Sequence, residues 1–173
     1  DDGALSSYNR VFPLLKQYKT PAVFAIPTSW INGNTKDAYE AYGKGNLMTW
    51  PQMREMQQSG LVEFASHSDD LHHGIIANPQ LNQQPAAITR EYFPAQQRYE
   101  SDRAYAKRVV KDLRQSKQIL DRELGINTRA IFWPYGAVTK ETEALAREAG
   151  LPMSFSLGSV LTLADADTTY QRA

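Results

Sequence analysis

The sequence predicts an α/β fold with a mainly parallel sheet. Short apolar runs bounded by turn residues alternate with longer segments of helical spacing, and polar residues follow several of the runs directly. Strands that alternate with helices pack as a parallel sheet covered by those helices. The chain has 173 residues, which is the length of one domain, and we expect a single domain over residues 1–173.

The first half of the chain shows this alternation clearly. Residues 4–18 place apolar side chains at helical spacing, and residues 21–27 form a short apolar run between two prolines, as buried strands do. Residues 32–46 are rich in Gly, Asn and Lys and are predicted to form a loop. A threonine cap and an early proline predict a helix over residues 49–59, and residues 61–65 form a second strand.

The second half begins with a long polar stretch, residues 66–100, which is expected to be irregular. Ser101 is a typical N-cap, and the helix that follows carries an apolar stripe and ends at Gly125. The remaining elements are expected as a strand over residues 129–133, a helix over 139–149 and a strand over 153–157, with no clear strand over 170–173.

Composition excludes several classes of function. Lys+Arg and Asp+Glu are both 19, so the chain lacks the basic surplus of a nucleic-acid-binding domain, and no nucleic acid partner is expected. There is no cysteine, which excludes a disulfide framework and a thiol nucleophile. A neutral chain with 10% aromatic residues suits a neutral ligand such as a glycan.

All three histidines lie within seven positions: His67, His72 and His73. His67 and His72 are five apart and would not share a helix face, so they indicate a loop that curls around a centre. Two imidazoles and a carboxylate form a metal site with open positions. The other interpretation is a solvated surface loop, in which Asp69 and Asp70 are solvated or support the loop.

Two further groups stand where strands are expected to end. Asp1-Asp2-Gly3 is either a simple turn or a pair of carboxylates that divide metal binding and proton transfer, with Gly3 permitting the bend. Trp133-Pro134-Tyr135 is either a structural turn or a device that aims the Tyr135 N–H at a developing oxyanion. Trp133 and Tyr135 also offer flat faces for stacking a sugar ring, as Trp30 and Tyr92 would.

Together, Asp-Asp-Gly, His-Ser-x-x-x-His and Pro-Tyr-Gly, in this order, resemble the first three motifs of the NodB-type polysaccharide deacetylases, carbohydrate esterase family 4. Flanking segments such as SGLVEFASHS, HHGI and FWPYG are similar to those of the periplasmic poly-β-1,6-N-acetyl-D-glucosamine N-deacetylases of biofilm export. The resemblance implies a distorted (β/α) barrel, incomplete in this chain because the upstream strand and the general-acid motif are expected outside it.

The resemblance also implies roles for particular residues. Asp1 is expected to be the general base, and the Tyr135 backbone N–H to hold the oxyanion. Asp2, His67 and His72 are expected to bind one divalent metal ion: Zn²⁺ first, with Ni²⁺, Co²⁺ or Fe²⁺ as alternatives. Ser68 is expected to support the loop by hydrogen bonding, and Trp133, Pro134, Tyr135 and His73 are expected to contact the substrate.

One position departs from the family pattern. Phe132 stands where the family usually has an arginine that pairs with the catalytic aspartate. The biofilm deacetylase branch lacks this arginine as well, so the departure agrees with the branch and predicts a less tuned base.

The predicted function is metal-dependent removal of N-acetyl groups from poly-β-1,6-N-acetyl-D-glucosamine. Open alternatives are a chitin-oligomer or peptidoglycan N-deacetylase and a non-catalytic, metal-containing glycan-binding module; a non-haem Fe(II) oxygenase fits the histidine spacing poorly. The resemblance implies a periplasmic location with outer-membrane lipid anchoring in the full-length form. It also implies a C-terminal glycan-binding domain and export machinery as partners.

Overall fold

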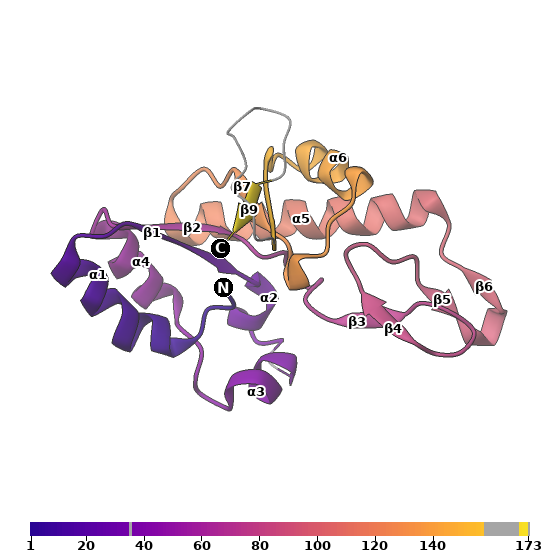
Figure 1. Ribbon diagram of the computed structural model, residues 1–173, viewed down its shortest axis with the longest axis horizontal. Helices are drawn as coiled ribbons and strands as arrows, with labels where there is room; N and C mark the ends of the chain where they lie inside the picture. Colours follow the sequence, from indigo (N-terminus) through magenta and orange to yellow (C-terminus); the bar gives the residue numbers. More distant parts are fainter. Residues whose placement is uncertain (35, 158–169, 173) are drawn as a thin grey trace.

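The computed structural model describes residues 1–34, 36–157 and 170–172 of the chain. Its centre is a five-stranded sheet in the order β1-β2-β7-β8-β9, and every neighbouring pair in it is parallel (Figure 1). This confirms the predicted α/β class with a parallel sheet. The strands are β1 (Ala22–Ile26), β2 (Val62–Ser66), β7 (Ala130–Phe132), β8 (Met153–Leu157) and β9 (Tyr170–Arg172).

The helices precede, follow or connect these strands. Residues 7–11 form a short π-helical segment, η1 (Ser7–Val11), that leads directly into α1. The two expected N-terminal threonine and serine caps are present: Thr49 begins α4 with a capping box, and the Ser101 hydroxyl accepts the Ala104 N–H at the start of α5. The helices are α1 (Phe12–Tyr18), α2 (Thr28–Ile31), α3 (Lys36–Tyr42), α4 (Trp50–Gln58), α5 (Asp102–Leu124) and α6 (Lys140–Glu148).

Two apolar clusters form the core, and α5 contributes to both. Its first half packs with Ile131, Trp133 and α6, and its last turns pack with β1, β2 and α4. The long helix therefore joins the two parts of the core across the sheet (Figure 1). The buried residues that α5 provides are Tyr105, Val109, Val110, Leu113, Ser116, Ile119, Leu120 and Leu124.

Two stretches predicted to be irregular contain regular structure. The expected loop over residues 32–46 holds α3, because Lys36–Tyr42 reads KDAYEAY, in which the lysine, the glutamate and the two alanines favour a helix. The polar stretch over residues 66–100 holds two antiparallel pairs, which lie to the right of the sheet in Figure 1. Its elements are β3 (Gly74–Ile76), β4 (Gln83–Pro85), β5 (Tyr92–Phe93), η2 (Pro94–Gln96) and β6 (Arg98–Tyr99).

The expectation of no strand over residues 170–173 is wrong, because β9 pairs with β8 there. At the other side of the sheet, β1 is the outer strand, and the Asp2 N–H donates to the Ala25 carbonyl at 2.9 Å. The Asp-Asp-Gly segment therefore lies against the carboxyl end of β1. The described strands form an open sheet, so the closed barrel that the resemblance implies is not seen in this part of the chain.

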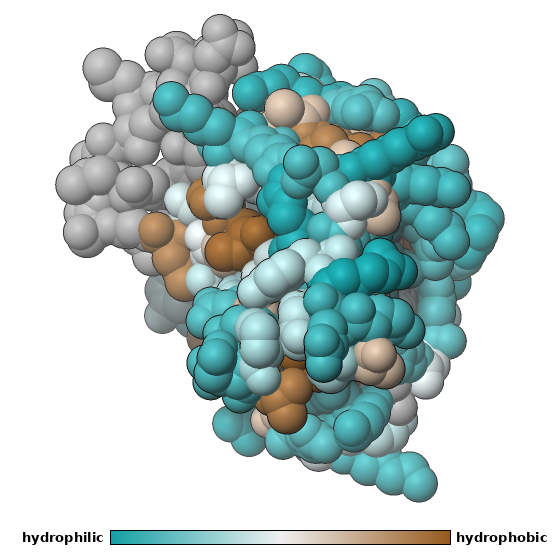
Figure 2. All heavy atoms as spheres, turned by 90° about the vertical axis from the view of Figure 1, so that its right-hand side faces the viewer, coloured by the Kyte–Doolittle hydropathy of each residue, from teal (hydrophilic) through white to brown (hydrophobic). Residues whose placement is uncertain are grey.

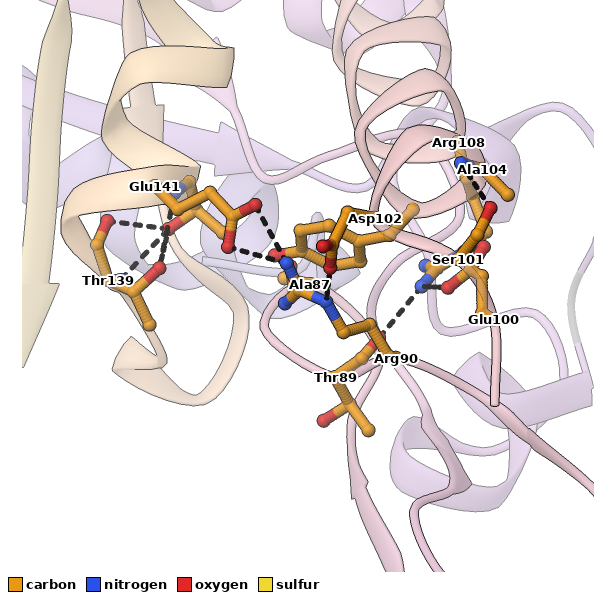
Figure 3. Close-up of polar contacts among 12 residues, drawn as sticks. Ala87, Thr89, Arg90, Glu100, Ser101, Asp102, Ala104, Arg108, Thr139 and Glu141 are labelled. Carbon is orange, nitrogen blue, oxygen red and sulfur yellow. Dashed lines mark hydrogen bonds and ion pairs between the residues drawn. The ribbon is translucent and has the colours of Figure 1, made fainter. Parts of the chain in front are cut away.

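A partly buried ion pair attaches the polar 66–100 stretch to α5 (Figure 3). Arg108 donates to both carboxylate oxygens of Glu100, at 3.0 and 2.7 Å, and its other N–H groups reach the carbonyls of Ala86 and Thr89. Glu100 is 8% exposed. A bidentate pair of this kind fixes geometry as well as adding energy, so the hairpins have a defined position on the helix.

Arg90 makes a second connection a short distance away (Figure 3). It donates to Asp102 in the first turn of α5 and to Glu141 in the first turn of α6, and its guanidinium lies over the Tyr105 ring. The face that carries the hairpins is mainly hydrophilic, with small separate apolar areas (Figure 2). Among the described helices, none combines the length and the apolar character needed to cross a bilayer.

Candidate metal centre

The site forms where neighbouring parallel strands end. The His67 N–H donates to the Ile26 carbonyl at the end of β1, and Ser66 is in register with Ile131 of β7. The segments that follow β2 and β7 therefore meet the Asp-Asp-Gly segment beside β1. Open α/β sheets place their binding sites at this edge because the connecting loops gather there.

Asp2, His67 and His72 bring three ligand-type atoms together. The Asp2 Oδ1 lies 3.4 Å from the His67 Nε2 and 3.3 Å from the His72 Nε2. All three atoms lie within 4.8 Å of one another. The structure thus gathers the three residues that the sequence predicted as ligands. Two imidazoles and one carboxylate are a donor set that holds a divalent ion and leaves positions open for water and substrate.

The His67 ring is held in one tautomer. Its Nδ1 lies 2.6 Å from the Phe132 carbonyl, and because a carbonyl only accepts, Nδ1 carries the proton. The side chain is almost completely buried, and burial, with a smaller opposing effect of Asp2, lowers the pKa of His67 to about 4. The ring is therefore neutral at pH 7, and its Nε2 lone pair faces Asp2.

The carboxylate oxygen between the rings has an unusual environment. Asp2 Oδ1 is buried, and no donor among the described residues reaches it with full hydrogen-bond geometry, although the His72 Nε2 lies 3.3 Å away and favours the charged carboxylate. Asp2 Oδ1 faces the lone pair of the His67 Nε2 at 3.4 Å, and two electron-rich atoms in this arrangement repel each other. A cation between them removes the repulsion and satisfies both atoms, so the residues present fit a bound metal ion.

Tyr42 fixes the other oxygen of the same carboxylate. Its hydroxyl donates to Asp2 Oδ2 at 2.6 Å. Burial favours the neutral acid, but the contacts with His72, Tyr42 and His67 outweigh it and hold the pKa of Asp2 below its ordinary value. Asp2 is thus an anion with one oxygen anchored and one free for a ligand. Its backbone adopts the left-handed region, with φ of 71°, so the bend begins at Asp2 itself as well as at Gly3.

Aromatic rings surround His72. Its ring centroid lies 4.8 Å from Trp30, 4.6 Å from Tyr135 and 4.9 Å from His67. Trp30 is 4% exposed and packs against the His72 ring, so it does not present an open face to a sugar, contrary to the sequence-based expectation. Tyr92 is also buried, against Tyr99 in the β5–β6 pair, and is not a stacking surface either.

The turn after β7 corrects a further expectation. Trp133 is completely buried, and its Nε1 donates to the Ser154 hydroxyl at 2.5 Å, so its ring cannot stack on a substrate. Pro134 is buried as well and acts through the backbone turn, η3 (Pro134–Gly136). Tyr135 is half exposed and adopts φ of 58°, a strained conformation for a tyrosine.

Gly136 allows that strained turn to pack closely. It has φ of 65°, and a Cβ at this position would lie 2.7 Å from side-chain atoms of Leu157 in β8. A larger residue would push the turn away from the sheet. The close packing therefore holds Tyr135 beside His72.

A groove opens next to His72 and Tyr135. It has a volume of about 550 Å³, within the usual range for small-molecule sites. His73 lines it, so this histidine lies on the groove side of the cluster and outside the group of three ligand-type residues. Asp1 is exposed and immediately precedes Asp2. The other lining residues are Trp30, Lys36, Asp37, Glu40, Ala41, Gly74 and Gln83.

Fold and site together define an α/β domain with a candidate metal centre, Asp2, His67 and His72, at the ends of its parallel strands. The chain belongs to the polysaccharide deacetylase family, whose model matches residues 1–154. This confirms the resemblance seen in the three sequence motifs.

Several individual proteins are similar to this chain over most of its length. A poly-beta-1,6-N-acetyl-D-glucosamine N-deacetylase of Escherichia coli (strain K12) is 34% identical over 165 residues, which are 93% of this chain and 25% of that relative. The BpsB deacetylase domain from Bordetella bronchiseptica has a TM-score of 0.85 and 41% identity, and the match covers 99% of this chain and 66% of that one.

A de-N-acetylase from Aggregatibacter actinomycetemcomitans has a TM-score of 0.88 and 38% identity, with the same 99% and 66% coverage. The chain thus spans a quarter of the length of the E. coli relative and about two thirds of these two solved chains.

Proposed function

We propose that this chain forms the catalytic domain of a metal-dependent hydrolase that removes N-acetyl groups from poly-β-1,6-N-acetyl-D-glucosamine. The observation that carries the proposal is Asp2 Oδ1, which is buried without a hydrogen bond between two imidazole Nε2 atoms. The polymer is proposed because relatives with this name match more than nine tenths of the chain.

Asp2, His67 and His72 would hold the ion. A site of two imidazoles and a carboxylate suits Zn²⁺, which we propose first, and also accepts Ni²⁺, Co²⁺ or Fe²⁺. When bound, the ion polarises the acetamide carbonyl and lowers the pKa of the attacking water. The Phe132 carbonyl and the Tyr42 hydroxyl orient two of the ligands, and partners of this kind raise metal affinity.

Two other residues would act on the reacting atoms. Asp1 accepts the proton of the attacking water, a role that fits an exposed carboxylate next to a ligand. The Tyr135 backbone N–H donates to the carbonyl oxygen as negative charge develops there, and the strained turn would keep this group in place. The reaction consumes one water, breaks the amide C–N bond, and releases acetate and the sugar amine.

The groove would hold the polysaccharide beside the ion. Tyr135 offers the exposed aromatic face that Trp133 does not, and His73 is close enough to the same groove to contact a sugar. We place the protein in the periplasm, anchored to the outer membrane in its full-length form, with a C-terminal glycan-binding domain and export machinery as partners. This placement follows the resemblance to the biofilm-export deacetylases, and the greater length of the E. coli relative leaves room only for the further domain.

Acetate release from a β-1,6-linked N-acetylglucosamine oligomer tests the proposal, with the full-length protein assayed with and without a chelator. We expect release that the chelator abolishes. Release from chitin oligomers or peptidoglycan alone would identify a different substrate. Binding of the oligomer without release would indicate a glycan-binding module and contradict the proposal.

A pair of variants separates the two aspartates. Asp1→Asn should abolish turnover while the metal stays bound, because Asp1 would act on a proton. Asp2→Asn should lose the metal as well. Loss of metal in Asp1→Asn but not in Asp2→Asn would show that the two roles are reversed.

A further inference from the structure

A buried carboxylate holds the loop that connects the two histidines. Asp112, in the middle of α5, accepts the Asp69 N–H at 2.8 Å with one oxygen and the Asp70 N–H at 2.7 Å with the other. These two residues lie between His67 and His72 in the sequence. Both oxygens of Asp112 are therefore used on the backbone that sets the path from one histidine to the next.

The rest of the loop is held from two sides. The Asp69 carboxylate accepts the Thr28 hydroxyl at 2.5 Å and the Gln115 amide at 2.6 Å. On the α5 side, the hydroxyls of Ser66 and Ser116 lie 2.8 Å apart. Arg108, Asp112 and Ser116 follow one another at four-residue intervals, so one polar edge of α5 anchors both the hairpins and this loop.

Burying the carboxylate of Asp112 costs stability, which is unexpected if the residue serves only to cap a loop. Burial, together with the nearby carboxylates of Asp69 and Asp70, raises the pKa of Asp112 to about 7, against the opposing effect of its two hydrogen bonds. An apolar residue would avoid that cost but would leave two backbone N–H groups without acceptors. The carboxylate is suited to this position because it can accept two adjacent N–H groups at once.

We propose that Asp112 is a positioning residue that sets the separation of His67 and His72, and through it the affinity and geometry of the metal site. This inference rests on the metal centre of the proposed function. Asp112 touches neither the ligands nor the groove in the contacts described, and it acts through the backbone of the intervening loop.

The same helix provides a matched control. Asp121 also lies on α5 and also accepts a loop N–H, that of Thr128, at 2.7 Å. Its second oxygen accepts Lys117 at 2.8 Å. The loop it holds leads into β7 and contains none of the three ligand-type residues. Asp121→Asn therefore shows what happens when a helix carboxylate stops holding a loop that carries no candidate metal ligand.

The experiment compares Asp112→Asn, Asp112→Glu and Asp121→Asn in the intact protein. Zn²⁺ affinity is measured by competition with a chromophoric chelator, the Co²⁺-substituted protein gives an absorption spectrum, and thermal unfolding of the metal-free form reports stability. We expect Asp112→Asn to weaken Zn²⁺ binding about 10- to 100-fold and to alter the Co²⁺ bands. Asp121→Asn should lower the unfolding temperature and leave affinity and spectrum unchanged.

Asp112→Glu keeps the charge and moves the carboxylate by one methylene, so it serves if the asparagine variant does not fold. It should also change the affinity and the Co²⁺ bands. Wild-type affinity and spectrum in a folded Asp112 variant would overturn the proposal, as would equal weakening by Asp121→Asn. If the unaltered protein bound neither Zn²⁺ nor Co²⁺, the metal centre itself would be refuted, which is a separate result.

Discussion

His67 and His72 present the same atom to Asp2 but are held in different ways. His67 is fully enclosed and fixed by a hydrogen bond from its opposite nitrogen to the Phe132 carbonyl. The His72 side chain is 15% exposed and lies among aromatic rings at the edge of the groove. One ring is set by a directional bond and the other by packing. We therefore expect the inner half of the site to be the more rigid, and the half that faces the groove to adjust more easily.

The strongest test replaces each histidine by alanine. Both variants should lose metal binding by more than the roughly 100-fold cost of losing a supporting contact, because a ligand itself is removed. The metal-free forms should differ: His67→Ala should lower the free energy of unfolding by about 1–3 kcal/mol, since it removes a buried ring together with its hydrogen bond to the Phe132 carbonyl. His72→Ala should cost less. If chemical denaturation gave equal losses of stability for the two variants, the two histidines would not be held differently.

The pH dependence of stability gives a second test. The pKa of His67 is about 4 in the folded chain and ordinarily about 6.5, so the unfolded state binds the proton first. The contribution of His67 to the stability of the metal-free protein should therefore fall as pH drops from about 6.5 to 4, by up to about 3 kcal/mol, while Asp112, whose pKa is raised to about 7, acts in the opposite direction over the same range. His67→Gln should remove the His67 contribution and so change the slope of stability against pH in this range, measured by denaturation in the presence of a chelator. An unchanged slope would show that other groups cause it.

Removing the Tyr42 hydroxyl should have a smaller effect. Tyr42→Phe keeps the ring and loses the hydrogen bond to Asp2 Oδ2, so metal affinity should fall about 10-fold. Tyr39→Phe, an exposed tyrosine on the same helix, is the control and should match the wild type. If the Tyr42→Phe variant bound the metal with unaltered affinity, the Tyr42 hydroxyl would not be needed to orient Asp2, and the histidines alone would orient it.

The smallest effect is expected from a change beside the His72 ring, which is held by packing. Tyr135→Ala removes one aromatic contact from His72, and such contacts are worth about 0.5–1.5 kcal/mol. Metal affinity should weaken only a few-fold, which isothermal titration can resolve. Tyr99→Ala, equally exposed but in the β5–β6 pair, should leave it unchanged. A loss as large as that in Tyr42→Phe would mean that packing holds His72 as firmly as a hydrogen bond holds Asp2.

The sequence was sufficient for the parallel sheet except its last strand, β9, and for the three ligand-type residues. Parallel strands bring their carboxyl ends to one edge, so Asp2 and His67 had to meet once the strands were recognised. Their supports were harder to predict. Tyr42 lies in a short helix whose flanking glycines and asparagines predict a loop. Asp112 is a polar residue beside the apolar stripe of α5, and such residues are usually exposed to solvent.

Trp133 was misassigned although the sequence held a usable signal. Side chains two apart on an extended segment lie on the same face, and Trp133 follows Ile131 of β7 by two positions. Ile131 is buried, and so is Trp133. The prediction that Trp133 is a stacking surface was based on its aromatic side chain and neglected the alternation of side chains along β7.

The hydrogen bond between the His67 ring and the Phe132 carbonyl also bears on how the site can change over generations. A carbonyl belongs to every amino acid, so a point mutation of codon 132 replaces the side chain and leaves this acceptor in place. Variation at that codon can therefore explore new pocket shapes while the imidazole keeps its tautomer. A lineage could lose or gain an arginine there without first having to rebuild its metal ligand.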